Sequence, residues 1–194
     1  MKSYKKTIEK TCLEIQYDED CESPREWSNL GYFITVDDGF RSPDMNTELE
    51  NWIKETGQEA DSQEEHIECI KDWFKMNSEE IVIAIYPITK YEHGGISYSL
   101  GTGHGFDNSN NGFYIITTET QKEMGTKKKD FERVIQSELD LYNKWCNGEV
   151  YGYTLYDDKG GIEDSCWGFY DLEHIREELP EEYKDEDLSD YLIE

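Results

Sequence analysis

The run EIVIAIYPI at residues 80–88 is β-branched and almost wholly apolar. Such a run predicts a central strand that is buried on both faces of a sheet. Pro87 is expected to end the hydrogen-bond ladder of this strand, because proline lacks an N–H donor. Downstream, GISYSL (95–100) and GFYIITT (112–118) predict two more strands, joined by a loop rich in Gly and Asn. Together the three runs indicate an antiparallel meander.

Two pairs of strand-like runs flank this region. TCLEIQY (11–17) and GYFITV (31–36) are expected to form a first hairpin. EVYGYTLYD (149–157) and IEDSCWGF (162–169) are expected to form a second, because the glycines between them suit the positive φ of a tight turn.

Helices are predicted between and after these strands. Ser62 and Glu65 have the spacing of a capping box, which favours a helix over residues 62–76. Residues 128–146 place apolar side chains at intervals of three and four, and Gly148 follows as a C-cap. A short helix is expected near residues 171–179.

These elements predict an α+β fold, with a mainly antiparallel sheet and two or three helices packed against it. A chain of 194 residues fits one domain of ordinary size. We expect this single domain to cover residues 1–179. Residues 180–194 are expected to form an acidic C-terminal tail, because Pro180 and the polar residues after it predict partial disorder until a partner binds.

The composition is very acidic, with 45 Asp and Glu against 19 Lys and Arg and a formal net charge of −26. Charge of this sign repels nucleic acid and anionic membranes and attracts basic surfaces. The same composition is also typical of adaptation for solubility or high salt. The sequence has no run near the ~20 apolar residues that a membrane span needs, and its five cysteines include no CxxC pair. We therefore expect a cytoplasmic protein without a nucleic-acid or membrane partner.

Cysteine chemistry is one possible activity. A thiolate nucleophile needs a nearby imidazole and a group that orients it. Cys166 and Asp164, with His93 or His104, could supply such a site. The alternative, which we favour, is a half-buried structural Cys166 beside a core Trp167. We therefore assign no catalytic residue.

Cofactor and metal sites have weak support. The loop at residues 101–105 has the glycines of a phosphate-binding loop but lacks its Lys and Ser/Thr. Asp107, Ser109 and Asn111 fit the first ligand positions of an EF-hand calcium loop, but Thr118 stands where a bidentate Glu is required. The four histidines lack metal-binding spacing. We expect no cofactor and assign no metal ligand, and calcium near Asp107 stays open.

Three segments carry a family resemblance: SPREWSNLG (23–31), YPITKYEHGGISYSLG (86–101) and GEVYGYTLYDDKGGIEDSCWGFYD (148–171). They resemble an uncharacterised family of small acidic proteins carried by bacteriophages and other mobile elements. The resemblance implies a phage or prophage origin and implies no catalytic activity.

The leading functional hypothesis is a phage-encoded acidic protein that inhibits a host nucleic-acid-handling or defence protein, of the anti-CRISPR or anti-restriction type. Its carboxylates would take the places of phosphates in a basic groove, as in DNA mimicry. The expected partner is a basic, nucleic-acid-binding host protein in the cytoplasm of the host cell. The candidate partner-binding residues are acids of the predicted helix at 62–76 and of the C-terminal segment: Glu64, Glu65, Glu68, Asp72, Glu177, Glu178, Glu181, Glu182, Asp185, Glu186 and Asp187.

Two other functions stay open. A phage accessory or regulatory module could bind its partner through an aromatic patch that includes Trp27, Tyr91 and Tyr98. A cysteine-dependent hydrolase is the third possibility. The sequence leaves the oligomeric state undecided.

Overall fold

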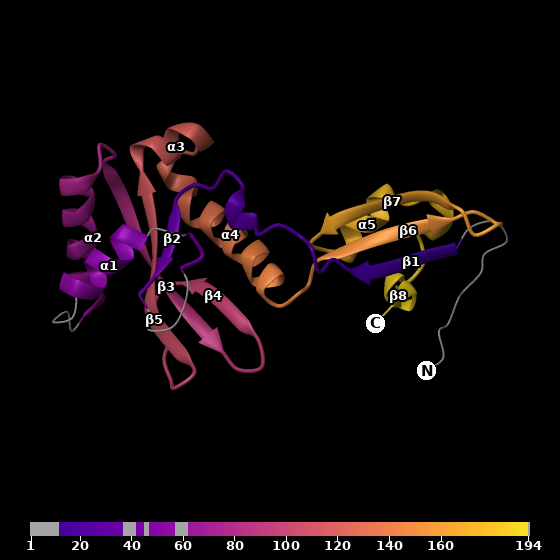
Figure 1. Ribbon diagram of the computed structural model, residues 1–194, viewed down its shortest axis with the longest axis horizontal. Helices are drawn as coiled ribbons and strands as arrows, with labels where there is room; N and C mark the ends of the chain where they lie inside the picture. The colour runs from indigo at the N-terminus through magenta and orange to yellow at the C-terminus, as the bar shows by residue number, and fades with distance from the viewer. Residues whose placement is uncertain (1–11, 37–41, 45–46, 57–61, 194) are drawn as a thin grey trace. The chain divides into compact units, whose positions relative to one another are not determined.

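The chain divides into two compact units in the computed structural model, which describes residues 12–36, 42–44, 47–56 and 62–193 (Figure 1). The central unit is continuous and contains residues 24–143, whereas the terminal unit combines residues 12–23 with 144–193. Each unit has its own four-stranded sheet and its own cluster of buried side chains. The predicted α+β class is confirmed, but the structure differs from the single domain expected over residues 1–179.

The sheet of the central unit has the strand order β2-β5-β3-β4 with antiparallel pairing throughout. Its strands are β2 (Tyr32–Thr35), β3 (Val82–Glu92), β4 (Ile96–Leu100) and β5 (Asn108–Thr117). The predicted meander is wrong, because β4 and β5 lie on opposite sides of β3 rather than following each other across the sheet. The strand buried on both faces is β5, whose residues from Gly112 to Thr117 are all buried.

Strand β3 runs through Pro87 instead of ending there. Pro87 is opposite Phe113 in β5, and its carbonyl oxygen accepts a hydrogen bond from the N–H of Gly101, just after β4. In an antiparallel sheet the N–H and C=O of one residue point to the same neighbour. The missing N–H of Pro87 therefore faces the end of β4, where no ladder bond is lost to β5.

Helices cover both faces of the central sheet (Figure 1). Helices α1 (Thr47–Thr56) and α2 (Gln63–Asn77) share a buried cluster with Ile34, Phe113 and Ile115. On the other face, Tyr142 of α4 (Phe131–Cys146) contacts Phe33, with their ring centroids 5.9 Å apart. The short helix α3 (Thr118–Met124) follows β5. None of the helices in the described part of the chain combines the length and apolar character needed to cross a bilayer.

The segment SPREWSNLG is held to the central unit by Arg25, which lies in the short 3-10 helix η1 (Pro24–Glu26). Its guanidinium pairs with both Asp44 and Glu138, and its side chain is only 3% exposed. Glu138 also accepts hydrogen bonds from the N–H of Leu30 and from the hydroxyl of Tyr114. This buried network gives the first of the three family-like segments a structural role.

The sheet of the terminal unit has the order β7-β6-β1-β8. Its strands are β1 (Cys12–Tyr17), β6 (Tyr151–Tyr156), β7 (Ile162–Phe169) and β8 (Leu192–Ile193). The predicted hairpin of β6 and β7 is confirmed, and Gly160 in its turn has φ of 82°. The predicted pairing of the first two strands is wrong, because β1 pairs with β6 and β8 whereas β2 belongs to the other sheet.

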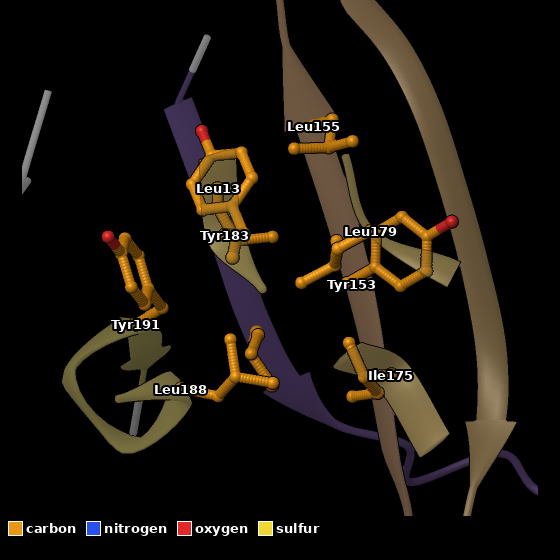
Figure 2. Close-up of a cluster of buried hydrophobic side chains, with 9 residues drawn as sticks. Leu13, Tyr153, Leu155, Ile175, Leu179, Tyr183, Leu188 and Tyr191 are labelled. Atoms are coloured by element: carbon orange, nitrogen blue, oxygen red, sulfur yellow. The ribbon is translucent and has the colours of Figure 1, made fainter. Parts of the chain in front are cut away.

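The C-terminal segment completes the core of the terminal unit. It forms α5 (Leu172–Glu178) and the 3-10 helices η4 (Glu181–Tyr183) and η5 (Leu188–Tyr191). Figure 2 shows Tyr183, Leu188 and Tyr191 in one buried cluster with Leu13 of β1. Residues 181–193 are thus packed, where a partly disordered tail was expected, because the apolar side chains between the acids are buried against the sheet.

Candidate functional site

The acidic face predicted on α2 is exposed. Glu64, Glu65, Glu68 and Asp72 are all exposed side chains, and the predicted cap is present, with Ser62 Oγ accepting a hydrogen bond from the N–H of Glu65. Two exposed lysines, Lys71 and Lys75, share the helix, and Lys71 Nζ lies 2.7 Å from Glu68 Oε1. The lysines reduce the negative charge of this face below what the acids alone indicate.

The acidic C-terminal residues are presented on a fixed backbone. All seven of the predicted residues are exposed except Glu186, which is partly buried. Arg176 Nη1 donates to the carbonyl oxygens of Lys184 (2.8 Å) and Glu186 (2.7 Å), which secures the turn. Hydrogen bonds from the hydroxyl and N–H of Ser189 lower the pKa of Asp187. The exposed members are Glu177, Glu178, Glu181, Glu182, Asp185 and Asp187.

The aromatic residues named for the alternative function differ in exposure. Trp27 and Tyr91 are exposed, but Tyr98 is buried, with its ring against the edge of Phe33 at 5.0 Å. Tyr98 is therefore excluded as a contact residue. Phe106 is fully exposed in the loop before β5. Phe106 was not predicted as a contact residue, because its loop was considered only for phosphate and calcium binding.

Cys166 is exposed, which contradicts its prediction as a half-buried residue. Cys166 lies on the edge strand β7. Its Sγ is 4.0 Å from the carbonyl oxygen of Trp167, which makes a weak hydrogen bond. His93 and His104 belong to the central unit, so no arrangement with Cys166 is defined. His93 Nδ1 instead lies 3.5 Å from Asp107 Oδ2.

The segment with partial EF-hand spacing, which starts at Asp107, is largely strand. Strand β5 begins at Asn108, and Asn110 Oδ1 accepts hydrogen bonds from Thr89 Oγ1 and the N–H of Gly103, both at 2.8 Å. Within the described residues, His, Cys, Asp and Glu form no group of three or more that could hold a metal ion.

An open groove of about 560 Å³ lies on the terminal unit; we call it the terminal-unit groove. Its lining residues are Gln16, Tyr17, Asp18, Glu19, Asp20, Trp167 and Ile193. Strand register places Ile193, Gln16, Gly152 and Trp167 in one row across β8, β1, β6 and β7. This row lies on the sheet face opposite to Leu13, Ile15 and Tyr153, which pack under α5 and η5.

Gly152 determines where the indole of Trp167 lies. A Cβ atom added at residue 152 would come within 2.1 Å of the Trp167 ring, so the indole covers this glycine closely. Trp167 nevertheless remains 46% exposed and Ile193 40% exposed. Trp167 was predicted to lie in the core, but the face covered by helices instead carries Asp164, whose carboxylate accepts a hydrogen bond from the Tyr153 hydroxyl.

An acidic turn, Asp18, Glu19 and Asp20, forms part of the lining of the terminal-unit groove. The N–H of Asp18 donates to the carbonyl oxygen of Val150, and Asp18 Oδ1 accepts from the N–H of Asp20. Burial, followed by the charge of Asp18, raises the pKa of the nearby Cys21 thiol. The groove was not predicted from the sequence, although three consecutive acids directly after a predicted strand were a visible signal.

Comparisons of the chain with protein-family models, with curated proteins and with solved structures found no match. The charge of the chain, its exposed side chains and the terminal-unit groove are therefore the observations from which function is inferred.

Proposed function

We propose that the protein binds and inhibits a basic, nucleic-acid-binding protein of a bacterial host, and that its carboxylates occupy sites built for phosphates. The observation that carries this proposal is the net charge of −26, with acidic side chains exposed on both units. An Arg/Lys groove attracts carboxylates as it attracts phosphates, and complementary fields speed association. The partner acts in nucleic-acid handling or defence and is met in the host cytoplasm.

The density of charge is sufficient for such competition. Duplex DNA carries one negative charge per roughly 1.7 Å of its axis, so 26 charges correspond to roughly 45 Å of duplex. As separate globules, the two units have diameters of roughly 30 and 35 Å. These lengths are comparable to that of the duplex, which supports DNA mimicry as the mode of inhibition.

Charge reversal tests the proposal. Basic nucleic-acid-binding proteins captured from a bacterial lysate are purified, and their association rates are measured with the parent and two quadruple Lys variants at low and high salt. One variant changes Glu64, Glu65, Glu68 and Asp72, and the other changes Glu177, Glu178, Glu181 and Glu182. Exposed substitutions usually change stability by no more than about 0.5 kcal/mol each. We expect slower association and lost inhibition with at least one folded variant.

The chain offers a matched control in its basic cluster. Changing Lys122, Lys127, Lys128 and Lys129, all exposed, to Gln alters four surface positions while making the net charge more negative. Association of this control with the partner is expected to be undiminished. If both acidic variants bind as well as the parent at equal salt, the acidic faces are only solvated surface and the proposal is wrong.

A second function is favoured by the exposure of Phe106. Phe106 is fully exposed, and Tyr91, near the end of β3, is also exposed. Such side chains suit an accessory module that binds its partner through aromatic contacts. Residue Asn108, two positions after Phe106, is paired with Tyr91 in the sheet. For this function, Phe106→Ala combined with Tyr91→Ala would abolish partner binding, and the affinity of the parent would change little with salt.

A further inference from the structure

We propose that the terminal-unit groove binds an arginine side chain from an extended basic segment of the partner, with the guanidinium between the Trp167 indole and the acidic turn. This inference rests on the proposed function only in taking the partner to be basic. It adds a defined site in the terminal unit and the chemistry that the site recognises.

The register of the sheet shapes a slot of suitable width. Neighbouring strands lie about 4.8 Å apart, so the row from Ile193 to Trp167 spans roughly 14 Å. The Trp167 indole covers Gly152. Gln16 therefore has the indole on one side and Ile193 on the other. A volume of about 560 Å³ falls in the range of small-ligand sites and accommodates one long side chain with its adjoining backbone.

The chemistry of the lining favours a cation with a flat face. An exposed indole attracts a guanidinium placed over its ring. Asp18, Glu19 and Asp20 line the groove with acidic residues, and carboxylates bind guanidinium in a bidentate manner. Gln16 adds an amide oxygen that can accept a further hydrogen bond. The acidic turn repels phosphates and other anions, so the ligand class is basic.

Arginine suits this lining better than lysine. Its guanidinium is planar, stacks on aromatic rings and presents donors in a fork, whereas the lysine ammonium is a compact and strongly hydrated charge. Ile193 and the indole offer an apolar surface to the methylene stem of the side chain. An extended segment suits this groove, because the groove lies open on a sheet face.

The probes are labelled hexa-arginine and hexa-lysine peptides, which are titrated into the full chain at about 150 mM salt. Binding is followed by the NMR shift of the Trp167 indole N–H, assigned with Trp167→Phe, and by fluorescence anisotropy. We expect hexa-arginine to shift this signal more than hexa-lysine does. Trp167→Ala should weaken hexa-arginine binding about threefold to tenfold, as expected for loss of a cation–π contact.

Two further variants keep the test decisive if Trp167→Ala fails to fold. Gly152→Ala retains every groove side chain but displaces the indole, and should weaken hexa-arginine binding to a similar degree. The triple variant Asp18→Asn, Glu19→Gln, Asp20→Asn should weaken it more than the matched control Asp158→Asn, Glu163→Gln, Asp190→Asn, which removes three exposed charges from the same unit outside the groove.

Equal hexa-arginine binding by the groove variants and the matched control would overturn the inference, because general attraction to a chain of net charge −26 predicts that result. Formation of a dimer in the absence of peptide, seen by light scattering and lost in Trp167→Ala, would overturn it in favour of a second copy as occupant. The proposed function can fail separately. If the groove binds hexa-arginine but the protein inhibits no basic host protein, the proposed function is wrong and the groove proposal stands. Lost inhibition in the acidic variants with unchanged peptide binding in the groove variants refutes the groove alone.

Discussion

Arg25 and Glu138 are 113 residues apart in the sequence, yet Arg25 Nη1 lies 3.1 Å from Glu138 Oε2 in the central unit. The same guanidinium also pairs with Asp44, donates to the carbonyl oxygen of Gly31, and lies 5.4 Å from the centroid of the Tyr114 ring. One cation thus joins η1, the start of β2, β5 and α4.

Removing this cation should destabilise the central unit. Arg25→Ala leaves Asp44 and Glu138 without their buried partner, and loss of one member of a buried pair costs about 3–5 kcal/mol. Urea denaturation followed by tryptophan fluorescence measures this loss. Arg25→Lys keeps the charge but lacks the fork and should recover only part of the stability. A loss below about 0.5 kcal/mol in Arg25→Ala would show that the network does not hold the unit together.

The C-terminal segment should be needed for the stability of the terminal unit. Tyr183 is fully buried in the cluster shown in Figure 2. Tyr183→Ala should therefore lower the free energy of unfolding by about 3–5 kcal/mol, the usual cost of truncating a large buried aromatic side chain. Glu181→Ala, an exposed change in the same 3-10 helix, should cost within about 0.5 kcal/mol. The comparison uses thermal and urea denaturation. Equal stability of the two variants would mean that this segment acts as a tail after all.

Thiol labelling should distinguish the cysteines by exposure. Cys166 is exposed whereas Cys12, Cys21, Cys69 and Cys146 are partly buried. A maleimide reagent at pH 8 should therefore label Cys166 first in the native protein, and mass spectrometry of digested samples identifies the site. Cys21 should react slowly, since its thiol has a pKa raised by burial and by Asp18. Uniform labelling of all five cysteines before unfolding would contradict the described packing.

Alkaline pH should weaken the central unit through Tyr32. Burial, followed by the hydrogen bond to Glu80, raises the pKa of Tyr32 to about 12. The neutral phenol is therefore favoured in the folded state, so its contribution is full below the unfolded pKa of about 10 and is lost as pH rises towards 12. Tyr32→Phe should lose less stability than the parent between these pH values in urea denaturation.

The same titration has an internal control. Because Glu80 raises the pKa of Tyr32, Glu80→Gln should lower the pH at which the Tyr32 phenolate forms, as followed by absorbance near 295 nm. The Tyr32→Phe spectrum supplies the baseline. An unchanged absorbance titration in Glu80→Gln would show that the carboxylate does not act on this phenol.

Local signals in the sequence predicted helices α2, α4 and α5 and one hairpin, but they did not predict α1 or α3. Helix α2 begins after the predicted cap Ser62, and Gly148 follows α4 with φ of 70°. Long-range pairing was not predictable in this way. Leu13 lies opposite Leu155 in the sheet, but the residues around each leucine give no signal that identifies the other as its partner. The hairpin predicted for β1 and β2 and the single domain both failed for this reason.

The candidate site shows the same division. Exposed acids were found by counting charges, because exposure of carboxylates follows from their chemistry alone. The terminal-unit groove needs Ile193, Gln16 and Trp167 in one row, and that row depends on the register of strands from both ends of the chain. The sequence predicted the hairpin of β6 and β7, which brings Gly152 and Trp167 together, but not the position of this hairpin beside β1 and β8.

The discontinuity of the terminal unit has a consequence for biosynthesis. Strand β1 ends at Tyr17, but its first partner begins at Tyr151. At about 5–20 residues per second, the ribosome needs roughly 7–27 s to supply that partner. All strands of the central sheet, which lie between residues 32 and 117, are synthesised in this interval. The nascent chain therefore carries an unpaired β1 throughout the period in which the central sheet can assemble.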